Sequence, residues 1–600
     1  MTKITFYGGV EEIGGNKVLV ETEAGIVLLD FGRRMGFHGN FFAEFIQPRS
    51  KNALRDLCRL GVLPVINGVY SKQFIDATSM VADQNDMKKL PLKEASDYWK
   101  MKNIQPYNPK SSTIDAVFVS HAHFDHIQDI SFLDPAILIH CTEETKIIAK
   151  AIGDVSTAGV DDQFYELKRE QAITAKKEHY KTVFPKELEY SDIDTKVNNI
   201  LDPRCGYDFT HEYLPRYRSY DTSATGKVKG IDFRLIPVDH SIPGACSVLL
   251  TLPDKKRLLY TGDLRFHGMK MTTIDDYVSQ VGTKPDFLII EGTRIDSTET
   301  LSEPEVQEHI KEDIKSAEGL VLLNFGWKDL SRFNVVYNAS KAIKRTLVIS
   351  PKLAYLLFEM YTNLPKIYPD PRDLENLKVY IKREDSLLYS KADYGKWKMG
   401  YLDFHGRNSA KGDKNIVRVA EELKCGGEVC KSTTPVFESG TSPVITKTWN
   451  LATHHLENGV KAYEIREKPS DYVLMFTPMD VNELFDLIPE NNADWPKARY
   501  ISASTEPFND EMEIDEARFM NWLDKFAVAY EFETDAKEHK HFIRRHVSGH
   551  VSQPELLELI TKLNPDVIMP IHTTNTELFT ELLRPRKPTV PKYGVPITLN

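Results

Sequence analysis

Three histidines and an aspartate crowd into residues 121–126, which read His-Ala-His-Phe-Asp-His. They directly follow the apolar residues 116–119, so we expect a buried strand that ends in this loop. Neutral imidazole nitrogens and carboxylate oxygens are the ligands that a borderline divalent ion such as zinc accepts. A solvated histidine-rich turn is the alternative interpretation. The position after a strand, with further ligand-type residues downstream, favours a metal site.

Four later apolar runs also end at side chains that bind metals or transfer protons. The runs end at residues 238, 261, 290 and 571, and the side chains that follow within two positions are His240, Asp263, Glu291 and His572. Loops at one edge of a rigid sheet are a common place to gather functional side chains. We therefore expect these four residues to meet the histidine loop in one site.

The composition describes an ordinary globular protein, with 41% hydrophobic and 27% charged residues among 600. A chain of this length needs two or more domains. No apolar stretch is long enough to span a bilayer and no signal-peptide pattern begins the chain, so we expect a cytoplasmic protein with no membrane partner. The net charge of −11 argues against indiscriminate nucleic-acid binding but allows a nuclease, because bound divalent ions can hold a phosphodiester.

The six cysteines form no Cys-x-x-Cys pair, which excludes a zinc ribbon and a thioredoxin-like motif. Cys425 and Cys430 are close enough in sequence for a local pair, but free thiols are the preferred interpretation in a reducing compartment. Nitrogen and oxygen atoms are therefore the expected metal ligands.

Residues from about 302 to 530 alternate apolar strand-like runs with helical stretches, which predicts a second α/β domain with a parallel sheet. Residues 37–112 and 152–229 look like insertions. No dinucleotide-binding or Walker motif occurs in the second domain. We expect the active site in the cleft between the two domains, because such a cleft has walls that can contact an extended substrate. Trp327, Lys328 and Arg332 are candidates for its wall, with solvated charges at a helix start as the alternative.

Together these motifs resemble the metallo-β-lactamase-fold β-CASP nucleases, and ribonuclease J among them. The residues that carry the resemblance are the glycine-rich residues 8–16, the loop 121–126, the segments 240–245 and 261–263, Glu291, the segment 546–553 with His550, and His572. These motifs cover nearly the whole chain. After His572 the chain reads Thr-Thr-Asn, where relatives carry Gly and an acidic residue, so the chain resembles a divergent member.

The resemblance implies a metallo-β-lactamase αββα sandwich with an inserted α/β β-CASP domain. Residues 1–301 would form the first part of the sandwich, 302–530 the inserted domain, and 531–600 the return to the sandwich. Only 28 residues follow His572, which leaves no room for the C-terminal domain of many relatives. A homodimer is therefore an open expectation.

The resemblance also assigns roles to the site residues. Two divalent ions are expected, zinc first and manganese as the alternative. One would be held by His121, His123 and His240, the other by Asp125, His126 and His572, with Asp263 shared between them. His550 would be the general acid, Glu291 would orient it and raise its pKa, and Asp30 would support the histidine loop. Ser548 and Gly549 are candidates for a substrate phosphate pocket, with a turn that only places His550 as the equal alternative.

The predicted function is a zinc-dependent phosphodiesterase that hydrolyses single-stranded RNA, as a 5′-3′ exonuclease with internal cleavage as a second mode. Three alternatives remain open. A compact β-lactamase or thioesterase would share the metal site but lack the large insertion. A DNA-directed β-CASP nuclease typically carries Val where this chain has His572. An inactive RNA-processing scaffold usually loses metal ligands, and here all seven are present.

Overall fold

The computed structural model describes residues 1–43, 46–49, 53–75, 101, 103–110, 114–156, 163–167, 171–175, 209–213, 216–269, 272–299, 301–383, 459–490, 494–507, 509–535 and 538–599. Cys205, Cys425, Cys430 and much of both expected insertions lie outside these residues. Cys58, Cys141 and Cys246, which are described, are free thiols. Within the described ranges no helix is both long and apolar enough to cross a bilayer.

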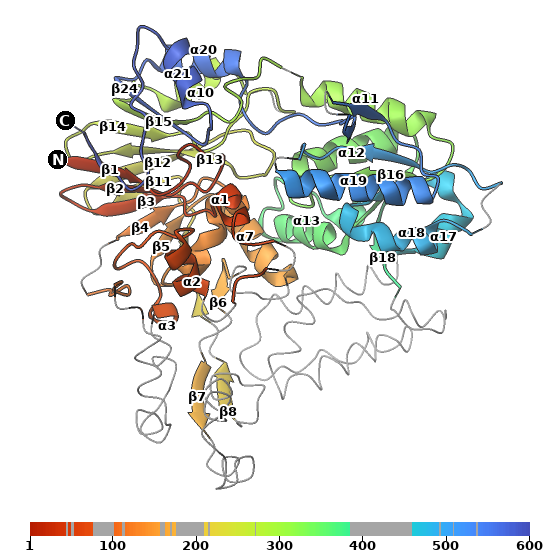
Figure 1. Cartoon of the computed structure of the whole chain (residues 1–600), viewed down its shortest axis with the longest axis horizontal. Coiled ribbons are helices and arrows are strands. Elements are labelled where there is room, and N and C mark those ends of the chain that lie inside the picture. The colour runs from red at the N-terminus through yellow and green to blue at the C-terminus, as the bar shows by residue number, and fades with distance from the viewer. Residues whose placement is uncertain are drawn as a thin grey trace.

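Two sheets face each other in the body that contains both chain ends (Figure 1). The first sheet has the order β10-β5-β4-β3-β2-β1-β25 and the second β11-β12-β13-β14-β15-β24. The first comprises β1 (Thr2–Phe6), β2 (Val18–Glu21), β3 (Ile26–Leu29), β4 (Ala116–Phe118), β5 (Leu138–His140), β10 (Tyr220–Asp221) and β25 (Ile597–Leu599). The second comprises β11 (Thr225–Val228), β12 (Ile231–Pro237), β13 (Cys246–Thr251), β14 (Arg257–Tyr260), β15 (Phe287–Glu291) and β24 (Val567–Ile571).

Alternation along the strands explains this layering. Ile4 and Phe6 of β1 are buried in the core shared with the second sheet, where they meet Phe233 and Val248. The other face of the first sheet packs against helices α2 (Ala53–Leu60) and α7 (Glu143–Val155). The outer face of the second sheet packs against α10 (Ile274–Val281), α20 (Gln553–Leu563) and α21 (Thr576–Leu582). The result is a four-layer arrangement of helices, sheet, sheet and helices.

A third sheet, with its helices, forms a separate α/β unit. Its order is β19-β18-β17-β20-β16-β21 and every neighbouring pair is parallel. Its strands are β16 (Val321–Asn324), β17 (Thr346–Ile349), β18 (Leu377–Ile381), β19 (Val460–Lys461), β20 (Tyr472–Met475) and β21 (Arg499–Ser502). Helices α11 (Glu303–Ser316), α12 (Leu330–Ala342) and α13 (Pro351–Asn363) cover one face, and α17 (Ala462–Glu467), α18 (Leu484–Leu487) and α19 (Asp510–Lys525) the other. The alternation predicted for this part of the chain is confirmed by these parallel pairs.

The α/β unit packs directly on the two-sheet body through α13 and α7 (Figure 1). Lys150 of α7 donates hydrogen bonds to Glu359 at 2.9 Å and to the Tyr355 hydroxyl at 3.1 Å, both on α13. The apolar core under the first sheet continues into α11, α12 and α13. After the α/β unit the chain returns to the two-sheet body, where β24 pairs with β15 and β25 pairs with β1.

Short elements complete the described fold. They are α1 (Met35–Gly39), α3 (Lys72–Ile75), α6 (Phe124–Ile127), β6 (Glu166–Leu167), β7 (Gln171–Ala175), β8 (Phe209–Tyr213), β9 (Arg216–Tyr217), β22 (Phe532–Thr534) and β23 (Lys540–Phe542). The fold class is therefore mixed α/β with several sheets. All five strands that the sequence analysis expected to end in functional residues are present, as β4, β12, β14, β15 and β24.

Candidate metal centre

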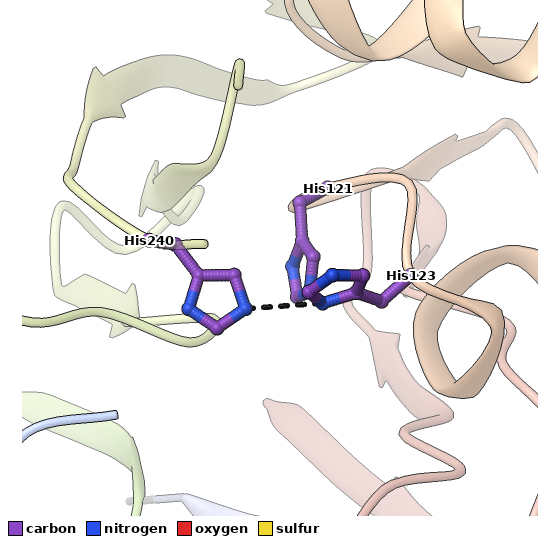
Figure 2. Close-up of side chains that lie close together, drawn as sticks. All are labelled: His121, His123 and His240. Atoms are coloured by element: carbon purple, nitrogen blue, oxygen red, sulfur yellow. Dashed lines mark hydrogen bonds between the residues drawn. The ribbon is translucent and has the colours of Figure 1, made fainter. Parts of the chain in front are cut away.

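Three imidazoles converge where β4 and β12 end (Figure 2). The Nδ1 atom of His123 lies 3.0 Å from the Nε2 of His121 and 3.0 Å from the Nε2 of His240. Burial lowers the pKa of all three, and for His240 the value is about 4 even though Asp263 opposes the shift. Neutral imidazoles that aim lone pairs at one point fit a divalent cation.

A second group of four residues lies beside the first: Asp125, His126, Asp263 and His572. The Nε2 of His126 lies 3.0 Å from the Oδ2 of Asp263, and the Nε2 of His572 lies 3.2 Å from the Oδ2 of Asp125. Burial lowers the pKa of His126, but the charges of Asp263 and Asp125 outweigh it and raise that pKa well above its usual value. This pocket therefore stabilises positive charge.

Asp263 lies between the two groups. Besides the contact with His126, its Oδ2 lies 3.7 Å from the Nε2 of His121, 3.6 Å from that of His572 and 4.0 Å from that of His240. Its Oδ1 is buried without a hydrogen-bond partner, and the Nε2 of His126, although 3.0 Å from the Oδ2 of Asp263, makes no hydrogen bond either. Buried polar atoms normally form hydrogen bonds. Two buried ligand atoms without one are expected where two metal-binding groups share a carboxylate.

Asp30 fixes the histidine loop through hydrogen bonds to its carboxylate. Its carboxylate accepts hydrogen bonds from the Ser120 backbone (2.7 Å), the Tyr260 hydroxyl (2.5 Å) and the Nδ1 of His126 (2.8 Å). Because Nδ1 of His126 is occupied in this way, its Nε2 is left for the centre. Asp30 and His572 both have a positive φ, +55° and +57°, a strained conformation that is concentrated at functional sites.

Two further contacts orient ring nitrogens toward the centre. The Nδ1 of His240 donates to the Gly549 carbonyl at 2.6 Å, and the Nδ1 of His572 lies 2.8 Å from the Thr293 hydroxyl. Each contact uses one nitrogen and leaves the Nε2 for a ligand position.

Thr293 and Tyr260 were missed in the sequence analysis. The only signal was their place, Tyr260 as the last residue of β14 and Thr293 two residues after β15.

His550 and Glu291 lie at the rim of the second group. The Nδ1 of His550 donates to the Oε2 of Glu291 at 3.0 Å and lies 3.9 Å from the Oδ2 of Asp263. Burial lowers the pKa of His550, but Glu291 and Asp263 outweigh burial and raise it to about 9. Glu291 is fully buried, and its other oxygen accepts from the Leu264 backbone at 3.0 Å. The structure thus pairs the two residues and gives His550 a proton at neutral pH.

The turn at Ser548 and Gly549 is occupied by internal contacts. The Ser548 hydroxyl accepts from the His550 backbone at 3.1 Å, and its carbonyl accepts from the Nε2 of His267 at 3.0 Å. The Gly549 carbonyl accepts from His240, as described above. These contacts place His550 and His240. The phosphate pocket at Ser548 and Gly549 stays a prediction.

The three wall candidates of the α/β unit separate into different roles. Arg332 is buried, forms an ion pair with Glu303 at 3.1 Å and donates to the Arg545 carbonyl at 2.8 Å, so its assignment to a cleft wall is wrong. Its charge is needed inside the fold, because Glu303 is also fully buried. Trp327 packs partly buried against the core. Lys328 reaches the metal-binding loop, where its Nζ lies 3.9 Å from the centre of the Phe124 ring.

Comparison with known proteins shows the fold but no family. No family model and no curated protein matches the chain. A crystal structure of a protein of unknown function from Enterococcus faecalis V583 matches over 100% of both chains, with 18% identity and a TM-score of 0.55. This likeness supports the same overall architecture.

Metallo-β-lactamase-fold proteins also match, over part of the chain. The protein YhfI from Bacillus subtilis matches over 57% of this chain and 93% of its own, with 13% identity and a TM-score of 0.21. A Cronobacter sakazakii metallo-β-lactamase HARLDQ-motif mutant, S60, matches over 46% and 70%, with 13% identity and a TM-score of 0.19. TM-scores of this size do not assign the chain to that fold. The case for a metal centre rests on the clustered His and Asp side chains.

Proposed function

We propose that this protein is a metal-dependent ribonuclease of the metallo-β-lactamase-fold β-CASP type. It would hydrolyse single-stranded RNA from the 5′ end, with internal cleavage as a second mode. The observation that carries the proposal is the pair of His550 and Glu291, held 3.0 Å apart beside Asp263, whose Oδ2 lies within 4.0 Å of imidazoles from both ligand groups. A proton donor next to two metal-binding groups suits the cleavage of a phosphodiester, in which a departing oxygen needs a proton.

The residues present fit two divalent ions, with zinc as the first choice and manganese as the alternative. When bound, such ions supply the Lewis acidity that activates water and neutralises phosphate charge. His121, His123 and His240 would hold one ion. Asp125, His126 and His572 would hold the other, and Asp263 would contribute to both.

Side chains of the protein would supply the proton for the leaving group. His550 would donate its proton to the departing 3′ oxygen, because its raised pKa keeps it charged at neutral pH. Glu291 would fix the His550 ring and stabilise its charged form through the hydrogen bond to Nδ1. Asp30 and Thr293 would hold the ligand rings in orientation.

RNA is preferred over DNA because His572 occupies the position of the third β-CASP motif. A DNA-directed nuclease is the second candidate. The metal-binding loop is contacted by Lys328 of the α/β unit, so that both bodies of the protein border the site. That arrangement suits a polymeric substrate with several contact points.

A digestion series tests the proposal. One labelled RNA would be prepared with a 5′ hydroxyl, monophosphate or triphosphate, and the same sequence would be made as single-stranded DNA. We expect mononucleotides released from the 5′ end of RNA, fastest from the monophosphate, only when zinc or manganese is present. Discrete internal fragments would support the second mode. Cleavage of the DNA alone, or of neither polymer by the metal-loaded protein, would overturn the proposal.

A further inference from the structure

Lys328 is a wall candidate that the structure brings to the metal-binding loop. Its ammonium sits 3.9 Å above the centre of the Phe124 ring, which lies between the ligand candidates His123 and Asp125. A cation above an aromatic face is attracted by the ring's electrons, which fixes the position of the charge. Phe124 belongs to the two-sheet body and Lys328 to the α/β unit, so this contact joins the two parts of the protein beside the metal-binding loop.

The backbone around Lys328 holds it in place. Residues 326–330 form a tight turn between β16 and α12, in which the Asp329 amide donates to the Gly326 carbonyl and the Leu330 amide to the Lys328 carbonyl, at 3.0 and 3.1 Å. The Asp329 side chain caps α12 by accepting from the Arg332 amide at 2.8 Å. Lys328 is therefore presented from a rigid turn and not from a long loop.

The charge of Lys328 has no anionic partner in the described part of the chain. No carboxylate there comes within 4.0 Å of its Nζ. Lys328 is half-buried, and burial lowers its pKa while Asp125 opposes the shift. Removing a cation from water costs free energy unless an anion binds next to it.

We propose that Lys328 binds a substrate phosphate next to the one that is cleaved, so that the site selects substrates with at least two phosphates in a chain. This inference rests on the proposed function and specifies its substrate class. The ammonium lies above Phe124 and belongs to none of the ligand groups, within each of which the ligand atoms lie within 4.8 Å of one another. A neighbouring phosphate of an oligonucleotide would occupy this position, whereas a small phosphodiester has no second phosphate to place there.

A non-reacting phosphate carries the same charge before and during the reaction, so its contact is uniform binding. Loss of that contact raises KM and leaves kcat unchanged. The test compares Lys328→Met, which keeps the aliphatic stem over Phe124, with Lys328→Arg, which keeps the charge. Lys341→Met is the matched control, because Lys341 is an exposed lysine in the last turn of α12, the helix that follows the Lys328 turn.

Each variant would be assayed on a single-stranded oligonucleotide and on bis(p-nitrophenyl) phosphate, which has one phosphate. We expect Lys328→Met to raise KM for the oligonucleotide about tenfold, the worth of one charge-assisted hydrogen bond. Its kcat, its metal content and both constants for the small ester should match the wild type. Lys328→Arg should recover most of the affinity, and Lys341→Met should change nothing.

Binding gives a second readout that does not depend on turnover. With an oligonucleotide carrying a non-hydrolysable backbone, the slope of log affinity against log salt should fall by about 0.7 in Lys328→Met, the value for one lost contact to a single strand. An unchanged slope, or an equal loss on both substrates, would overturn the inference while leaving the nuclease proposal intact. If wild type hydrolyses the small ester but neither cleaves nor binds RNA or DNA, the proposed function itself fails.

Discussion

Glu291 and His550, 259 residues apart in sequence, meet at 3.0 Å between Oε2 and Nδ1. Glu291 ends β15 in the second sheet, and His550 lies in the turn before α20, on the stretch that returns from the α/β unit. The pair therefore forms only when the return segment is docked on the two-sheet body. Its placement beside Asp263 links proton transfer to the metal-binding groups.

His550→Ala should leave both metals bound but lower kcat by roughly 10²–10⁴, the usual worth of a positioned general acid. None of the hydrogen bonds described above for the seven ligand side chains passes through its imidazole, because His240 is held by the Gly549 carbonyl instead. Turnover and metal content would be measured on the same preparation. A 3′-phosphorothiolate linkage should partly rescue the variant, since a sulfur leaving group needs no proton. Loss of a metal, or no rescue, would show that His550 is a ligand or a positioning residue.

Glu291→Gln should cause a smaller loss of kcat than His550→Ala and should shift the basic limb of the pH–rate profile to lower pH. The amide keeps the size of the side chain but removes the charge that raises the pKa of His550. The profile would be recorded from pH 6 to 10 at saturating substrate and metal. A basic limb that stays in place would contradict the role of Glu291.

Asp263→Ala should abolish activity and lower metal content, because its Oδ2 lies within 4.0 Å of four ligand imidazoles. Elemental analysis of wild type purified without chelator should give about two equivalents of transition metal, since seven ligands are too many for one tetrahedral ion. A stoichiometry of one that added zinc or manganese does not change would count against a shared carboxylate.

The sequence was sufficient to predict the strands that carry the ligands, because each is a short apolar run that stops at a polar side chain of distinctive type. Asp30, His121 and Glu291 lie where such runs end. It was not sufficient to predict partners brought together by packing. The contact of Thr293 with His572 spans 279 positions and leaves no periodic signal. Arg332 looked like a wall residue because it is a basic side chain shortly after the strand that leads to Phe325, yet its guanidinium turns inward to the buried Glu303.

Asp329→Asn should stabilise the protein at pH 8 more than at pH 4.5. Burial raises the pKa of Asp329 to about 6, against the opposing charge of Arg332. A raised folded-state pKa means that this group's contribution to stability is fully present below about 3.9 and is lost as pH rises through 6. Asparagine is an equally good N-cap for α12, so the variant removes the charge and keeps the hydrogen bond to the Arg332 amide.

Thermal unfolding of both proteins at the two pH values measures this effect. Asp276→Asn is the control, because the pKa of Asp276 is lowered by its hydrogen bonds to Thr273 in a capping box. That variant should be less stable than wild type at both pH values. A difference between Asp329→Asn and wild type that does not grow with pH would contradict the assignment.

Gly549→Ala should weaken metal binding at the three-histidine group without a general loss of fold. A Cβ at this position would lie 2.7 Å from the Cε1 of His240 and 2.9 Å from its Nδ1, closer than real Cβ contacts come. The same glycine's carbonyl accepts the hydrogen bond that fixes the His240 ring, so the added methyl must move either the ring or the turn. Gly326→Ala is the matched control, because its Cβ would meet only the Asp329 Cβ at 4.0 Å. We expect Gly549→Ala to bind less metal than wild type, toward one equivalent, and to lose activity that added zinc partly restores, while the control keeps two. Retention of both metals and full turnover by Gly549→Ala would show that His240 does not depend on this turn for its position.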